Sequence, residues 1–171
     1  MKILCISGSN RDRSSNIKLL KALPFLQPDW DFEIFRQLHQ LPIFTAPTEP
    51  HPWPTIVVSW REALSKSDAL IICTPEYIYN VPAIIKNALE WVTASGELLN
   101  KPVLPITVMP HPPRGEKAMQ SLLWSLQALD AKILTQLPLY QNEISYDDLG
   151  HLMDGDTKEI LLAALALLKE G

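Results

Sequence analysis

The chain has 171 residues, close to the size of a typical single domain, and we expect one domain over residues 1–171. Its 19 acidic residues outnumber 15 basic ones, and no basic run exists, which argues against a nucleic-acid or anionic-membrane partner. The first apolar run is too short for a signal peptide, and no stretch approaches the length of a membrane span. We therefore expect a cytoplasmic protein.

Apolar runs of strand length alternate with helical patterns, which is typical of βαβ units and a parallel sheet. Strands are predicted at residues 2–7, 31–36, 69–73, 103–109 and 132–135. Helices are predicted at residues 14–23, 55–67, 82–94, 116–129 and 157–169. The first strand is apolar on both faces apart from Lys2, so it should be central and covered by helices on both sides. We predict a doubly wound α/β fold with a five-stranded parallel sheet of order 2-1-3-4-5.

A polar loop, residues 7–16, joins the first strand to the first helix. Hydroxyl, amide and guanidinium groups at a helix N-terminus can bind a phosphate, because free N–H groups and the helix dipole attract anions there. The candidate groups belong to Ser9, Arg11, Ser14 and Asn16. The alternative is that Ser14 or Ser15 merely caps the helix, which would explain the serines but not Arg11.

A second loop, residues 74–82, follows the third predicted strand and is stiffened by Pro75 and Pro82. It carries Tyr77 and Tyr79. The carboxyl ends of parallel strands share one edge of the sheet, where open α/β sheets bind ligands. A phosphate loop beside an aromatic platform predicts a mononucleotide site, which could take FMN or another nucleotide.

Cys5 suggests a rival hypothesis, a phosphatase. Cys5 and Arg11 have the Cys-x5-Arg spacing with which protein tyrosine phosphatases hold a phosphoryl group over a thiolate. Against a phosphatase, Asp12 would repel a phosphate monoester. Cys5 and Cys73 both lie inside predicted strands, where a cysteine is usually a buried thiol, and neither has a Cys or His at metal-binding spacing. We therefore predict no disulfide and no metal.

Two further features leave alternatives open. The segment 42–54 carries Pro42, Pro47, Pro50, Pro52 and Pro54. It is either a lid or contact surface, or a strap that folds Phe44, His51 and Trp53 back onto the core. The wide apolar surface of helix 82–94, with Trp60 and Trp124 nearby, predicts a subunit interface unless Trp60, Trp91 and Trp124 all lie in the core.

Two motifs resemble signatures of the NADPH-dependent FMN reductase family. Residues 8–16 are similar to its Gly-Ser-x-Arg-x-x-Ser-x-Asn opening, and residues 74–91 to its Thr-Pro-Glu-Tyr-x-x-x-x-Pro-x-x-x-Lys-Asn-Ala-x-Asp-Trp signature. With Lys101-Pro102-Val103 as a third landmark, the resemblance spans about the first two thirds of the chain. It implies a flavodoxin-like fold, FMN, NADPH or NADH as reductant, small-molecule flavin, quinone or azo-type acceptors, and a homodimer or homotetramer.

Position by position, the resemblance implies that the FMN phosphate is held by Ser9, Arg11, Ser14, Ser15 and Asn16. It implies that the flavin ring is flanked by Pro75, Glu76, Tyr77 and Ile78, with Ile78 replacing a common Asn. The family's third loop is glycine-rich, but here it reads Pro110, His111, Pro112, Pro113, Arg114 and Gly115, and its three prolines remove backbone donors. We hypothesise that His111 or Arg114 supplies a cationic contact near N1 and O2 of the reduced flavin.

The reaction implied is ping-pong hydride transfer through flavin N5, with the chemistry carried by FMN and no catalytic side chain. The side chain of Glu76 is expected to bind loop backbone and not to transfer a proton. Two other functions stay open: a flavin- or nucleotide-binding module without turnover, and the Cys-x5-Arg phosphatase.

Overall fold

The computed structural model describes residues 1–46 and 52–170. The strands are β1 (Lys2–Ser7), β2 (Asp31–Ile34), β3 (Ala69–Thr74), β4 (Pro102–Met109), β5 (Lys132–Ile133) and β6 (Leu137–Tyr140). The helices are α1 (Ser15–Leu26), α2 (Thr55–Ser65), α3 (Ala83–Glu90), α4 (Glu116–Gln127) and α5 (Asp156–Glu170), with short 3-10 turns at Leu38–Gln40 and Gln141–Glu143. Strands and helices alternate as the sequence predicted.

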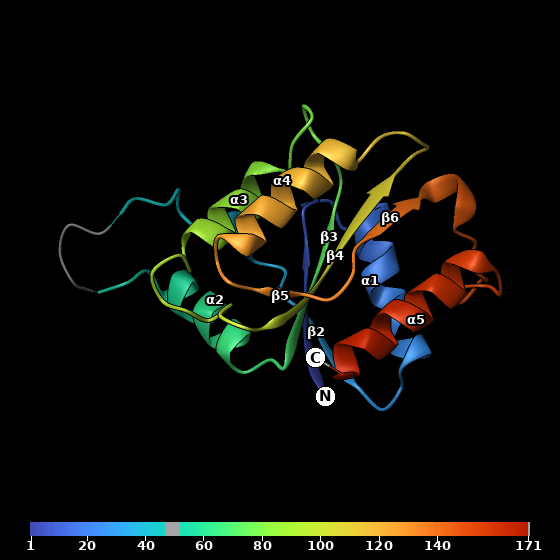
Figure 1. The fold of residues 1–171 in the computed structure, drawn as a ribbon, viewed down its shortest axis with the longest axis horizontal. Helices are drawn as coiled ribbons and strands as arrows, with labels where there is room; N and C mark the ends of the chain where they lie inside the picture. The colour runs from blue at the N-terminus through green and yellow to red at the C-terminus, as the bar shows by residue number, and fades with distance from the viewer. Residues whose placement is uncertain (47–51, 171) are drawn as a thin grey trace.

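The strands form one parallel sheet of order β2-β1-β3-β4-β5, with β6 also paired to β4. Ile3 and Cys5 of β1 pack under α1 and α5, whereas Leu4 and Ile6 face the core beneath α2, α3 and α4. Figure 1 shows these two helical layers on either side of the sheet. The predicted α/β class, strand order and central first strand are confirmed.

The edge strand differs from the prediction, because two short strands replace the single strand expected at 132–135. Ile133 pairs with Val103, and Leu137 pairs with Ile106. Residues 134–136 therefore lie opposite only Leu104 and Pro105, so one extra residue interrupts the ladder. Pro105 has no N–H to offer a neighbouring strand at this point. Within the described residues the sheet consequently has six strands, not the predicted five.

The proline-rich segment 42–54 packs on the core at both of its described ends. The rings of Phe44 and Trp53 lie edge-on to Trp91, with centroids 5.2 Å and 5.7 Å away. Trp91 Nε1 also donates a hydrogen bond to the carbonyl of Pro42 at 2.8 Å. These contacts support the strap alternative for Phe44 and Trp53. His51, Pro47 and Pro50 lie outside the described residues.

The tryptophans divide between the core and the surface. Trp60 is fully buried and donates from Nε1 to the Ala88 carbonyl, and Trp91 is nearly buried. Trp124, on α4, is 64% exposed. Burial of all three in the core was therefore wrong for Trp124. Across residues 1–46 and 52–170, the helices are too short or too polar to cross a bilayer.

Candidate functional site

The loops after β1 and β3 meet at Gly8. Ser7 pairs with Cys73 in the ladder, and the Gly8 N–H donates to the Cys73 carbonyl at 2.9 Å. A β-carbon on Gly8 would lie 2.2 Å from Thr74 Oγ1 and 3.1 Å from Pro75 Cδ, so only glycine fits. The predicted phosphate loop and aromatic loop therefore begin side by side at one edge of the sheet.

The β1–α1 loop ends in a capped helix. Ser14 Oγ accepts a hydrogen bond from the Ile17 N–H at 3.2 Å, so Ser14 caps α1. The N–H groups of Ser15 and Asn16, in the first turn of α1, donate to no acceptor among the described residues. Helix N–H groups of this kind bind anions. The buried Ser9 accepts from the Arg11 N–H through Oγ.

The charges of this loop favour an anion. Arg11 and Arg13 are exposed, and neither forms an ion pair in the part of the chain that the structure describes. Asp12, which we expected to repel a phosphate monoester, is paired with Arg36. The loop thus presents two guanidinium groups whose charge is not already neutralised, beside free backbone N–H groups.

Cys5 does not have the environment of a phosphatase nucleophile. The side chain is fully buried among the apolar residues under α1 and α5. Burial raises the pKa of the Cys5 thiol far above its usual range, because a thiolate would lose its hydration there. A reactive thiolate needs an accessible, electropositive site. The phosphatase alternative is therefore contradicted by the position of its nucleophile.

The β3–α3 loop begins with a tight hairpin. Tyr77 and Asn80 exchange two backbone hydrogen bonds of 2.9 Å and 3.0 Å around Ile78 and Tyr79, whose φ angles are 51° and 56°. This is the geometry of a type I′ turn. A β-branched residue is strained there, whereas Asn, common at this position in the family that the chain resembles, adopts it readily. The loop thus keeps the backbone shape that Asn favours.

The predicted ring-flanking residues differ in exposure. Pro75 is buried against Gly8, while Tyr77 and Tyr79 are exposed and Ile78 is 97% exposed. The turn therefore presents two aromatic rings and an aliphatic side chain to solvent beside the sheet edge. Such a surface suits a planar, largely apolar ligand.

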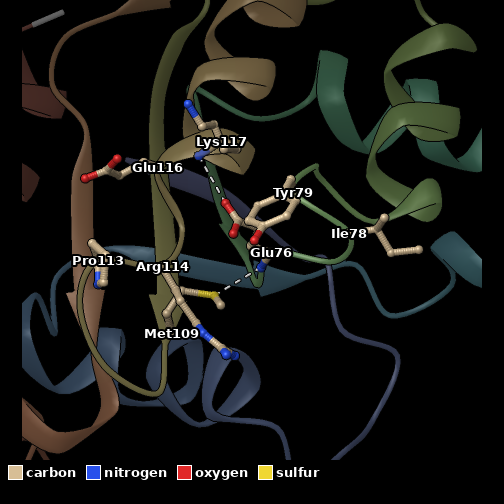
Figure 2. Close-up of a pocket in the computed structure, with 8 residues that line it drawn as sticks. All are labelled: Glu76, Ile78, Tyr79, Met109, Pro113, Arg114, Glu116 and Lys117. Carbon is tan, nitrogen blue, oxygen red and sulfur yellow. Dashed lines mark hydrogen bonds between the residues drawn. The ribbon is translucent and has the colours of Figure 1, made fainter.

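Glu76 links this loop to the start of α4. Its carboxylate accepts hydrogen bonds from the Lys117 and Ala118 N–H groups, both at 3.0 Å. Its own N–H lies 3.1 Å from Met109 Sδ (Figure 2). The side chain binds backbone, as expected, but the backbone of α4 and not of its own loop. A carboxylate engaged in this way stabilises the helix N-terminus and is not a free base.

A cavity of about 560 Å³ lies between the β3–α3 loop and the start of α4. Its lining residues, drawn as sticks in Figure 2, are Glu76, Ile78, Tyr79, Met109, Pro113, Arg114, Glu116 and Lys117. Sequence reasoning did not assign Met109, Glu116 or Lys117 to the site. Their places in the sequence could have indicated them, because Met109 is the last residue of β4, and Glu116 and Lys117 are the first residues of α4.

The third predicted loop contributes unevenly. Arg114 lines the cavity, whereas Pro110 and His111 are exposed and do not line it. His111 Nδ1 lies 2.9 Å from the Pro112 carbonyl. Gly115 is buried with φ at 101°, and a β-carbon there would lie 2.9 Å from Met109 Cγ. Arg114, and not His111, therefore lies on the wall of the cavity, and Gly115 has a packing role.

The chain is similar to known proteins in sequence and in fold. Residues 1–141 match the family model of NADPH-dependent FMN reductase. An NAD(P)H-dependent FMN reductase of Pseudomonas aeruginosa is 26% identical over 174 residues, covering 99% of this chain and 94% of that protein. A quinone reductase of Escherichia coli is 26% identical over 178 residues, with the same coverage. The flavoenzyme NAD(P)H:(acceptor) oxidoreductase FerB from Paracoccus denitrificans shares the fold, with a TM-score of 0.82 at 24% identity over 98% of this chain and 95% of that one.

Proposed function

Because this chain belongs to the NADPH-dependent FMN reductase family, we propose that it passes a hydride from NAD(P)H to a flavin, quinone or azo-type acceptor in a ping-pong reaction. The flavodoxin-like members of this family are oxidoreductases that use FMN and NAD(P)H. FMN, when bound, accepts and returns the hydride at N5. The observation that best supports the proposal is the contact at Gly8, where the β1–α1 loop begins beside the aromatic β3–α3 loop.

The residues of the first loop fit a flavin mononucleotide phosphate. Free N–H groups at Ser15 and Asn16 supply donors, and Arg11 supplies a guanidinium not engaged in an ion pair among the described residues. Charge-assisted hydrogen bonds of this kind are roughly twice as strong as neutral ones. Ser14, by capping α1, keeps this turn in the shape that presents the donors.

The other loops position and shield the ring. Pro75 is buried and rigid, and Tyr77, Ile78 and Tyr79 provide apolar surface beside the cavity. Positioning of this kind is the main contribution that a protein makes to hydride transfer by a bound cofactor. The carboxylate of Glu76 is occupied by α4 and is not free to act as an acid or base, and hydride transfer through a bound flavin asks little acid–base chemistry of the protein.

The proposed reaction is tested by loading the purified chain with FMN and adding NADPH without oxygen. The flavin absorption bands should bleach and should recover when a quinone is added. Initial rates at several quinone concentrations should give parallel double-reciprocal lines. Intersecting lines would contradict the ping-pong order, and a coloured protein that NADPH does not bleach would instead indicate a binding module without turnover.

Arg114 is proposed to stabilise negative charge on the reduced ring, because it is a cation that lines the same cavity as Ile78 and Tyr79 of the aromatic turn. We expect Arg114→Ala to lower the flavin midpoint potential. An exposed cation contributes up to about 1 kcal/mol, which is about 20 mV for a two-electron couple. His111→Ala is the matched control and should leave the potential unchanged. Spectroelectrochemical titration measures both, and an unchanged potential in Arg114→Ala would contradict this role.

We also propose that residues 1–171 form a single FMN-binding domain that assembles as a homodimer or homotetramer. Support for assembly comes from the exposed Trp124, which lines a surface groove of about 350 Å³ together with Leu89 and Leu129. A large aromatic side chain in such a groove is typical of protein contacts. Light scattering on the purified protein measures the molar mass directly.

A further inference from the structure

A hydrogen bond joins the phosphate loop to the strand that carries the aromatic loop. The Cys73 Sγ–H donates to Asn16 Oδ1 at 3.3 Å, between residues 57 apart in the sequence. Cys73 is fully buried in β3, and Asn16 is 2% exposed in the first turn of α1. The bond thus connects two elements of the site from beneath its surface.

This bond settles the orientation of the Asn16 amide. An Asn side chain has an acceptor at one end and two donors at the other. With Oδ1 held by Cys73, Nδ2 points the other way. Nδ2 has no hydrogen-bond partner among the described residues. Among the side-chain nitrogen and oxygen atoms of those residues, Thr107 Oγ1 alone is both fully buried and without a partner, so Nδ2 is not fully buried. Nδ2 therefore remains accessible as a donor.

The thiol is a permanent donor. Burial raises the pKa of Cys73 well above its usual range, and the nearby Cys5 acts in the same direction. The group therefore keeps its proton at neutral pH. A protonated thiol can donate to the amide oxygen but offers only a weak acceptor to the amide nitrogen, so it favours the observed orientation.

We propose that Cys73 is a positioning residue, whose thiol holds the amide of Asn16 so that Nδ2 donates to the phosphate of FMN. The inference rests on the proposed placement of that phosphate at the β1–α1 loop. Cys73 itself contacts no ligand. Its role is to fix one donor of the phosphate site to the strand from which the flavin-flanking loop begins.

The test compares two buried thiols. Cys73→Ala should weaken FMN binding to the apoprotein about three- to tenfold, the effect of one neutral hydrogen bond. Cys73→Ser retains a donor and should stay near wild type. Cys5→Ala is the matched control, because Cys5 is equally buried, belongs to the same apolar cluster and makes no hydrogen bond from its side chain among the described residues. Flavin fluorescence quenching gives the dissociation constants, and thermal unfolding without FMN gives the stability cost of each change.

A double-mutant cycle separates positioning from packing. In an Asn16→Ala background, Cys73→Ala should cost no further affinity, because the amide that it orients is gone. Cys73→Val, which fills the site without a donor, should behave like Cys73→Ala and covers the case in which the alanine variant folds poorly. The role is overturned if Cys73→Ala and Cys73→Val bind FMN as tightly as Cys5→Ala, or if their cost persists undiminished without Asn16. A wild-type chain that bound no FMN would overturn the proposed function as well.

Discussion

Gly8→Ala is expected to destabilise the protein by about 3 kcal/mol or more and to abolish tight FMN binding, because overpacking forces two loops apart. The new β-carbon would lie 2.2 Å from Thr74 Oγ1 and 2.9 Å from Thr74 Cβ. Thr74 is fully buried, and its hydroxyl already donates to the Pro75 carbonyl at 3.0 Å. The threonine therefore cannot move aside without losing that bond. Urea unfolding of the apoprotein and FMN titration measure the two effects.

Two further variants show whether the clash is the cause. Thr74→Ala in the Gly8→Ala background removes the 2.2 Å contact and should restore part of both stability and affinity. Gly96→Ala is the control, since no heavy atom lies within 4 Å of its added β-carbon. Its φ of +80° should cost about 1 kcal/mol of backbone strain, but FMN affinity should not change. Wild-type affinity in Gly8→Ala would contradict the contact on which the site depends.

The fold was predictable where burial is strong on both sides of a strand. Ile3, Leu4 and Ile6 leave β1 no polar face, and the strand lies between β2 and β3 as expected. The edge strand was less predictable, because it is partly solvated and its pairing depends on β4. No local pattern in residues 132–140 shows that Pro105 lies opposite the interruption.

The site was predictable to the level of loops but not of contacts. The rule that parallel strands end at one edge brought residues 7–16 and 74–82 together, and the structure has them in contact at Gly8. The two hydrogen bonds between α4 and Glu76 join residues that are 41 and 42 positions apart in the sequence. The hydrogen bond between Cys73 and Asn16 joins residues that are 57 positions apart. Such pairs depend on the relative placement of whole elements, which no short motif specifies.

Residue type also failed to predict burial where helix orientation decides it. Trp60 and Trp124 lie on different helices of the same layer, yet one is fully buried and the other is exposed. The difference follows from the face of the helix that each occupies. Trp60 points toward α3 and bonds to Ala88, whereas Trp124 lines the outer groove between α3 and α4.

Arg11→Ala is expected to weaken FMN binding about ten- to a hundredfold, the effect of losing a hydrogen bond to a charged group. Arg11 is exposed and has no ion pair among the described residues, so its guanidinium can approach a phosphate without breaking another contact. The loss should shrink as salt is added, because exposed charges are screened. Fluorescence titrations at low and high ionic strength measure this dependence.

Arg13→Ala provides the matched control, since it removes the same charge from the same loop. If Arg11 contacts the phosphate directly, Arg13→Ala should cost much less affinity, through the general field alone. Arg36→Ala adds a third comparison. In wild type, Arg36 neutralises the carboxylate of Asp12. Without Arg36 that carboxylate should repel the FMN phosphate and weaken FMN binding, although Arg36 itself lies outside the loop. Equal losses in Arg11→Ala and Arg13→Ala would argue for a diffuse positive field. Wild-type affinity in Arg11→Ala would contradict a direct contact between Arg11 and the phosphate.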